Sequence, residues 1–162
     1  MIATAYMQSP IGILEITGSE LGISSLKRIE LEHSPKGSEN KILDTCKSQL
    51  KEYFERQRTT FEIKLDFSGH TDFHKDVWNE LLKIPYGHTV SYSSIANAIE
   101  NPDAVRAVGL ANKYNPIAII VPCHRVIGKN GDLTGYFYGI DTKRMLLELE
   151  NPMSFSRQGS LF

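Results

Sequence analysis

The residues best suited to chemistry form the run Pro122-Cys123-His124-Arg125-Val126, directly after the apolar stretch 117–121. A thiolate is a strong nucleophile, and cationic neighbours stabilise it by lowering the pKa of the thiol. His124 could take the proton from Cys123, but adjacent side chains of an extended chain point in opposite directions. That role therefore needs a turn in the backbone or a bridging water. The run predicts either an activated nucleophile or a small buried cysteine beside a surface histidine.

Other side chains could complete such a site. Glu148 and Glu150 fall on a predicted last helix, and either could orient a histidine, with a solvated helix face as the alternative for each. Arg106 lies on an earlier predicted helix beside the small residues Ala107 and Gly109. Small neighbours would let this helix approach a surface closely around one arginine. The alternative is a helix that packs against its own domain.

The cysteines and histidines do not show the spacing of a metal site. The chain has two cysteines, Cys46 and Cys123, without a C-x-x-C pair, and its five histidines form no H-E-x-x-H motif. We therefore expect no metal, no cofactor and no disulfide. Cys46 falls on the apolar face of a predicted helix, where a core cysteine is expected.

Two predicted domains must position these residues. Residues 1–70 show short β-branched and apolar runs between turn signals, which is typical of a small antiparallel sheet. The periodicity then changes to that of an amphipathic helix and back to that of a strand. The boundary is expected at Ser68-Gly69-His70-Thr71. The elements expected before it are strands at 3–8, 11–17, 23–28 and 61–67 and a helix at 40–58.

Residues 71–155 are predicted to form a second, mostly helical domain. A helix over 73–82 is followed by two short helices, for which Ser91 and Asn101 are the expected caps. Two short helices joined by a tight turn are a helix-turn-helix candidate.

The end of this domain is less regular. The apolar stretch 117–121 is expected to be a buried strand or core segment. Asp141 could cap a last helix, whose apolar face would hold Met145, Leu146 and Leu149. Residues 156–162 are predicted to be a flexible tail.

The composition of the 162 residues is that of a globular protein, with 41% hydrophobic and 23% charged residues and a net charge of −1. No apolar run approaches the roughly 20 residues that a membrane-spanning helix needs. The N-terminus lacks the pattern of a secretory signal, so we expect a soluble intracellular protein. The balanced charge gives no support for nucleic-acid binding, although a local basic patch could be hidden in it.

Five motifs occur in an order that resembles one family. The chain resembles the O6-alkylguanine-DNA alkyltransferases, also called methylated-DNA–protein cysteine methyltransferases, over nearly its whole length. The resemblance implies an α+β fold, with a small ribonuclease H-like N-terminal antiparallel-sheet domain and a mostly helical C-terminal domain with a helix-turn-helix. The motifs are Ile84-Pro85-Tyr86-Gly87, Val90-Ser91-Tyr92, Arg106-Ala107-Val108-Gly109, Asn115-Pro116 and Pro122-Cys123-His124-Arg125-Val126.

The same resemblance implies direct DNA repair. Cys123 would take the alkyl group, mainly methyl, from the O6 of a guanine flipped out of the duplex, and would keep it as a thioether after one turnover. His124 would act as the base through a water, Glu150 would orient His124, and Asn115 would brace the turn. Tyr136 would hydrogen-bond the guanine. The remaining residues expected at the substrate are Phe137, Tyr138 and Val126.

The implied partner is double-stranded DNA carrying O6-alkylguanine, bound through its minor groove by a monomer and without a membrane. Arg106 would fill the gap left by the flipped base, and Tyr92 would press on the phosphate backbone. Ala104, Ala107 and Gly109 would allow close approach to the groove. The resemblance implies a cytoplasmic protein in a prokaryote and a nuclear one in a eukaryote.

The chain departs from the family pattern at several positions. Phe137 and Tyr138 stand where small residues are common, so we expect methyl adducts to react and bulky benzyl-type adducts to react poorly. Leu110 and Tyr114 also replace smaller residues, and Ala118 replaces a proline of some members. The main alternative is a non-catalytic alkyl-lesion-binding protein, and others are a helix-turn-helix regulator and a cysteine hydrolase of another class.

Overall fold

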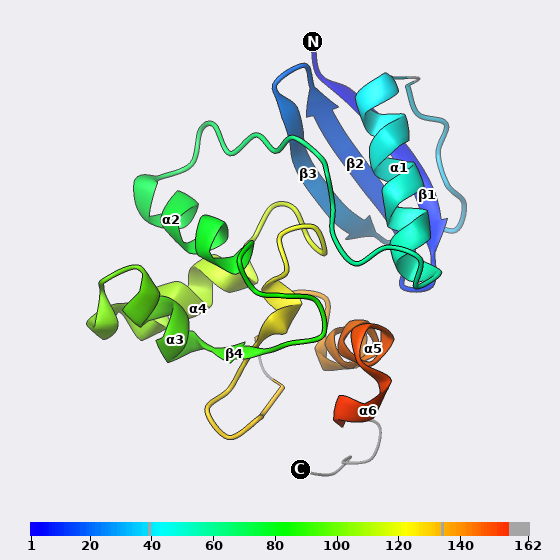
Figure 1. The fold of residues 1–162 in the computed structure, drawn as a ribbon. Helices are drawn as coiled ribbons and strands as arrows, with labels where there is room; N and C mark the ends of the chain where they lie inside the picture. Colours follow the sequence, from blue (N-terminus) through cyan, green and yellow to red (C-terminus); the bar gives the residue numbers. More distant parts are fainter. Residues whose placement is uncertain (39, 134, 156–162) are drawn as a thin grey trace. The chain divides into compact units, whose positions relative to one another are not determined.

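The described chain, residues 1–38, 40–133 and 135–155 of a computed structural model, divides into two compact units (Figure 1). The first holds Met1–Gly69 and the short segment Pro116–Ala118. The second holds His70–Asn115 and the chain from Ile119 onward. The predicted tail, 156–162, lies outside the described residues. No helix in the described part is long and apolar enough to cross a membrane.

The first unit is an antiparallel sheet with one helix against it (Figure 1). Its strands follow chain order: β1 (Ala3–Ser9), β2 (Gly12–Ser19) and β3 (Gly22–Ile29). The helix α1 (Lys41–Phe54) begins after Asn40, whose side chain accepts hydrogen bonds from Ile42 N and Leu43 N in the first turn. Cys46 is fully buried on the face of α1 that contributes to the core, as predicted.

The segment 61–67 is not the regular strand that its alternation predicts. It forms a single parallel bridge, in which Ile23 N donates to Lys64 O at 2.8 Å and Asp66 N donates to Ile23 O at 2.8 Å. Two segments share the free edge of β3, because three residues further along this strand Leu26 N donates to Pro116 O at 2.9 Å. Each segment therefore pairs with β3 at one residue only. This sharing also places Pro116–Ala118 in the first unit, although the sequence placed it in the second domain.

The second unit contains the predicted pair of short helices. After α2 (Asp72–Leu81), the strand β4 (Val90–Ser91) pairs in parallel with β5 (Val126–Ile127) and leads into α3 (Tyr92–Ala98). Ser91 caps α3 as predicted, since its hydroxyl accepts from Ser94 N at 3.1 Å. The second member consists of the 3₁₀ turn η1 (Pro102–Ala104) and α4 (Val105–Lys113).

Asn101 occupies the predicted cap position, before Pro102 at the start of η1, but its side chain makes no capping hydrogen bond. Its backbone carbonyl instead accepts from Ala104 N at 3.0 Å, which closes the 3₁₀ turn. The predicted cap at Asp141 is wrong. The last long helix, α5 (Ile140–Glu150), follows Gly139, whose φ of 95° favours glycine, and Asp141 is exposed in its first turn.

The buried face of α5 also differs from the prediction. Met145 is exposed, whereas Leu146 and Leu147 are buried together with Lys143 and Glu150. These four positions follow the spacing of one helix face. Two charged side chains therefore point into the protein. The short helix α6 (Pro152–Phe155) follows.

The apolar stretch 117–121 is a core segment and not a strand. All five of its side chains are buried, and beyond one bridge between Ile117 and Leu26 it forms turns. Ile119 has a φ of 71°, a conformation that a β-branched residue rarely adopts. The chain reverses here and enters the 3₁₀ turn η2 (Cys123–Arg125).

Candidate active site

Cys123 begins the η2 turn and is almost completely buried. The turn is closed by hydrogen bonds of 2.8 Å from Cys123 N to Val121 O and 2.9 Å from Arg125 N to Pro122 O. This local geometry supplies the backbone turn that the run of reactive residues needs. The chain is not extended where Cys123 and His124 meet.

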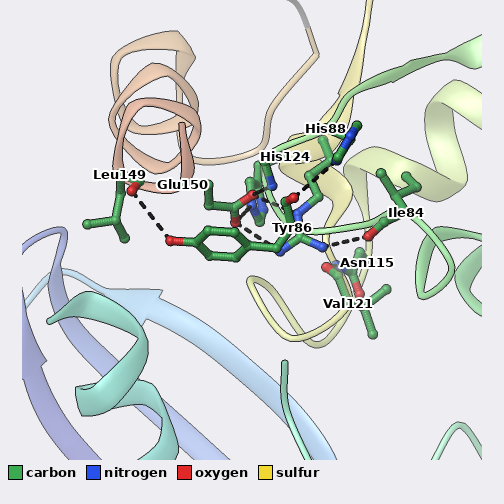
Figure 2. Close-up of polar contacts among 10 residues, drawn as sticks. Ile84, Tyr86, His88, Asn115, Val121, His124, Leu149 and Glu150 are labelled. Carbon is green, nitrogen blue, oxygen red and sulfur yellow. Dashed lines mark hydrogen bonds and ion pairs between the residues drawn. The ribbon is translucent and has the colours of Figure 1, made fainter. Parts of the chain in front are cut away.

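Asn115 ties the turn to the end of α4. Its Nδ2 donates to Val121 O at 2.8 Å (Figure 2). The same Nδ2 donates to Cys123 Sγ at 3.2 Å. From α4, Asn112 Nδ2 donates to Cys123 O at 3.2 Å. Two amide side chains therefore fix both the backbone and the sulfur of Cys123.

The thiol is buried and is not activated in the resting protein, which is the cysteine environment of the second of the two alternatives that the sequence leaves open. Burial raises the pKa of Cys123 to about 11, although the Asn115 hydrogen bond and the charge of Lys143 oppose this. Desolvation outweighs the cationic neighbours because the sulfur has almost no access to water. Cys123 is therefore a protonated thiol at neutral pH, and its reaction requires a base.

His124, the next residue, is fully buried. Its Nε2 lies 2.6 Å from Glu150 Oε2 (Figure 2). A carboxylate can only accept a hydrogen bond, so Nε2 carries the proton and donates it. The Nδ1 atom is buried without a hydrogen-bond partner among the described residues. Burial lowers the pKa of His124, so the ring is neutral at neutral pH and its Nδ1 lone pair can accept a proton.

Arg125 binds the same carboxylate and does not face the thiol. Its Nε donates to Glu150 Oε1 at 2.8 Å and its Nη2 to Oε2 at 3.0 Å. The third guanidinium nitrogen, Nη1, donates to Ile84 O at 2.7 Å. Burial raises the pKa of Glu150, but the contacts with His124 and Arg125 outweigh it and hold the pKa far below its usual range. Glu150, and not the half-buried Glu148, is the carboxylate of this site.

Lys143 belongs to the site and was missed by sequence reasoning. It is fully buried, and its Nζ donates to Val126 O at 2.6 Å. Burial lowers the pKa of Lys143 to about 8, while the charge of a Cys123 thiolate would raise it. A signal existed, because Lys143 precedes Glu150 by two helical turns and so shares its face.

Tyr92 is half-buried at the start of α3 and lies beside Lys143, whose Nζ is 6.0 Å from the centre of its ring. A Cβ atom at Gly135 would lie 3.0 Å from the Tyr92 hydroxyl oxygen, and one at Gly109 would lie 3.9 Å from its ring. Gly135 also has a φ of 70°. Gly135 therefore leaves space that the tyrosine hydroxyl occupies, whereas a side chain at Gly109 would make only an ordinary contact with the ring.

The remaining predicted residues occupy two regions. Val126 and Tyr136 are buried, Tyr138 is half-buried and Phe137 is exposed. On η1 and α4, Arg106 and Ala107 are exposed and Ala104 is half-buried, so no hydrogen bond joins this group to the thiol. The structure thus forms two hydrogen-bonded groups, Asn115 with Cys123 and Glu150 with His124, which meet only because Cys123 and His124 are adjacent in the chain. The predicted groove residues Arg106 and Ala107 lie on the surface. Among the described residues, no group of three or more His, Cys, Asp or Glu side chains could hold a metal ion.

Both halves of the chain match known domains of one family. Residues 2–67 match the 6-O-methylguanine DNA methyltransferase, ribonuclease-like domain, and residues 72–152 match the 6-O-methylguanine DNA methyltransferase, DNA binding domain. The chain belongs to the 6-O-methylguanine DNA methyltransferase family. The predicted family and the predicted α+β fold are both confirmed.

Relatives in this family are similar along nearly the whole chain. The methylated-DNA–protein-cysteine methyltransferase of Mycobacterium tuberculosis is 48% identical over 154 residues, which is 93% of each protein. That of Methanosarcina acetivorans is 49% identical over 152 residues, 90% of this chain and 96% of the relative. The crystal structure of Mycobacterium tuberculosis OGT in complex with DNA superposes with a TM-score of 0.83, at 47% identity over 92% of each chain.

The buried acid–base pair of this methyltransferase-family chain predicts sensitivity to acid. The pKa of His124 is lowered from 6.5 in the folded protein. Just below pH 6.5 the imidazole is therefore protonated in the unfolded chain but still neutral in the folded one, which lowers the free energy of unfolding. The pKa of Glu150 is lowered from 4.5, so a second loss follows below that value. We expect the free energy of unfolding to fall on acidification by at most about 1.4 kcal/mol per pH unit for each group. Urea unfolding at a series of pH values measures this, and His124→Gln should lose the first step and weaken the second, which Arg125 alone would then support.

Lys143→Met is expected to change how stability depends on alkaline pH. Since burial lowers the pKa of Lys143 from 10.5 to about 8, the fold disfavours its charged form at neutral pH. Wild-type stability should therefore rise as the ammonium loses its proton between these two values, by roughly 3 kcal/mol relative to the variant. Urea unfolding of both proteins across this range gives the difference. If the free energies of unfolding of the two proteins change in parallel with pH, burial does not lower the pKa of Lys143.

Proposed function

We propose that this chain repairs DNA directly, by irreversible transfer of the alkyl group of O6-alkylguanine, mainly methyl, to Cys123. The observation that carries the proposal is the buried His124–Glu150 pair, which directly follows the buried Cys123 thiol in a chain of this family. A nucleophile, a base and a group that orients the base are the parts that such a transfer needs. The methyltransferase names of the relatives support the same activity.

The proposed step is a displacement at the alkyl carbon. His124 Nδ1 accepts the thiol proton through a water, and the sulfur–carbon bond forms as the carbon–oxygen bond breaks. The electron pair of the broken bond goes to the guanine, which leaves after taking a proton, and Tyr136 hydrogen-bonds the leaving base. Glu150 holds the imidazole in orientation, and Asn115 holds the sulfur. The product is a thioether, so each protein molecule reacts once.

We further propose that the substrate is a nucleotide flipped out of double-stranded DNA by a monomer bound in the minor groove. An atom inside a duplex is unreachable, and extrusion costs a few kcal/mol. Arg106, exposed on α4, is suited to fill the space that the nucleotide leaves. The minor groove carries a degenerate pattern of donors and acceptors, which suits a protein that must act at any sequence. The DNA complex of the Mycobacterium tuberculosis relative supports binding to DNA.

Intact mass spectrometry tests the proposal. The protein is mixed with a short duplex that contains one O6-methylguanine, and with the same duplex unmodified as the control. We expect a gain of one methylene in mass with the lesion only, at most one per molecule, on the Cys123 peptide and not on the Cys46 peptide. Tight lesion binding without a mass gain would instead indicate a non-catalytic lesion-binding protein. Neither binding nor mass gain would overturn both functions.

The aromatic residues after Tyr136 predict selectivity for small alkyl groups. The ring of Tyr138 lies 5.7 Å from that of Tyr136 and 5.1 Å from that of Phe137, so the loop is filled. Forcing extra bulk into a filled site costs roughly 1–3 kcal/mol. O6-benzylguanine should therefore inactivate the wild type at least about tenfold more slowly than a variant in which the Tyr138 ring has been removed. Tyr138→Gly should restore the rate, measured by competition with the lesion duplex. Potent inactivation of the wild type would contradict this.

A further inference from the structure

Three large apolar side chains gather on the exposed surface of the second unit. Leu110 is 57% exposed, Tyr114 is 59% exposed and Phe137 is 53% exposed. The rings of Tyr114 and Phe137 contact each other at an angle of 64°, with centroids 5.9 Å apart. We call Leu110, Tyr114 and Phe137 the aromatic ridge. Single exposed apolar residues are ordinary, but a cluster of them indicates a surface that binds something.

The aromatic ridge shares its helix face with positive charge. Arg106, Leu110 and Tyr114 follow at intervals of four residues, and the helical bond from Tyr114 N to Leu110 O measures 3.0 Å. Lys113 lies beside them, with its Nζ 5.8 Å from the centre of the Tyr114 ring. A partner of this face must therefore accept both apolar contact and cations. A nucleic acid does so, through its sugars and bases and through its phosphates.

Ring contacts connect the aromatic ridge to the buried Tyr136, the residue proposed to hydrogen-bond the guanine. Phe137 contacts Tyr138, which contacts the buried Tyr136. At the start of the same loop, Gly135 lies against Tyr92, whose ring is near the Lys143 ammonium. The ridge therefore faces outward from the loop that lines the proposed substrate pocket, where the DNA around a flipped nucleotide must lie.

We propose that the aromatic ridge is an apolar contact surface for duplex DNA, which packs against sugars and base faces beside the flipped nucleotide. The inference rests on the proposed function and adds to it how binding energy is obtained. The balanced net charge of −1 provides no overall attraction to phosphates, so apolar contacts on this face would add to the local ones of Arg106 and Lys113. Apolar side chains pressed against unstacked bases supply affinity that depends little on salt.

The salt dependence of binding separates apolar from phosphate contacts. The dissociation constant for a lesion duplex is measured between about 50 and 200 mM salt, in the full chain with Cys123→Ser to prevent reaction. Tyr114→Ala and Phe137→Ala should each weaken binding about tenfold at every salt concentration without a change in slope. Tyr114→Phe, which keeps the ring, should bind as its parent. Lys113→Ala is the matched control on the same helix and should lower the slope by about one.

Three results would overturn the inference. The first is unchanged affinity in both alanine variants, with folding verified from the melting temperature. The second is that the cysteine-containing Tyr114→Ala variant transfers the alkyl group from free O6-methylguanine base as much more slowly as it binds DNA more weakly, which would place Tyr114 in the substrate pocket. The third is a wild-type dimer that Tyr114→Ala converts to a monomer. A wild type that transfers no methyl group from lesion DNA would overturn the proposed function itself. The three results above overturn only the inference about the ridge and leave the proposed function in place.

Discussion

Cys123→Ser is expected to abolish alkyl transfer completely while the protein stays folded. A serine hydroxyl is a far weaker nucleophile than a thiol and would not be ionised by a neutral imidazole. The oxygen can still accept the hydrogen bond that Asn115 now donates to sulfur at 3.2 Å. The turn that carries the residue should therefore persist. Intact mass after incubation with the lesion duplex measures the loss.

Cys46→Ser is the matched control for this experiment. Cys46 is also buried, and it lies on α1 in the first unit. Burial raises the pKa of its thiol to about 12, and among the described residues no charged group opposes this shift. We expect its serine variant to transfer normally, at some cost in stability from a buried hydroxyl of about 1–3 kcal/mol. A methylated Cys123→Ser protein would show that another residue is the acceptor.

The parts of this protein that local patterns determine could be predicted from the sequence. Ser91 is a good cap, and α3 begins beside it. The amphipathic period of α1 places Cys46 in the core. The order of five motifs identifies the family, because each motif keeps residues that chemistry needs at fixed places. These features depend on neighbours in the chain.

The parts that failed depend on residues distant in the sequence. The alternation of 61–67 indicates one buried face, but only the β3 edge decides how much of the segment can pair. The pKa of Cys123 follows from total burial, which no local pattern of cations reveals. Arg125 follows Cys123 and His124 in the chain, but its guanidinium binds Glu150 of α5 and not the thiol. Lys143 looks like a solvated helix residue until that helix is seen to bury the face on which it lies.

Glu150 is expected to have the largest effect of any residue that does not touch the substrate. It joins His124 and Arg125, which are both buried, so Glu150→Ala leaves two polar groups without their partner. Removal of one member of a buried ion pair costs about 3–5 kcal/mol of stability. Urea unfolding should show this loss. Any variant of Glu150 must therefore be tested for folding before its activity is interpreted.

Glu150→Gln separates orientation of the base from stability. The amide keeps the shape and can accept from Arg125, but it no longer stabilises charge on His124 during proton transfer. We expect single-turnover transfer to slow by about 100-fold or more, and the rate to depend more steeply on pH as direct ionisation of the thiol takes over. Glu148→Gln, half-buried on the same helix, is the matched control and should keep the wild-type rate and pH profile.

A double variant decides whether Arg125 acts through the carboxylate. Its guanidinium binds Glu150 through two nitrogens, so most of the stability cost of Arg125→Met comes from the unpaired carboxylate that it leaves. When Glu150→Gln has already removed that charge, Arg125→Met should add much less to the loss of stability and of rate. If the losses from Glu150→Gln and Arg125→Met simply add in the double variant, Arg125 stabilises the fold through its hydrogen bond to Ile84 O and does not help to orient His124.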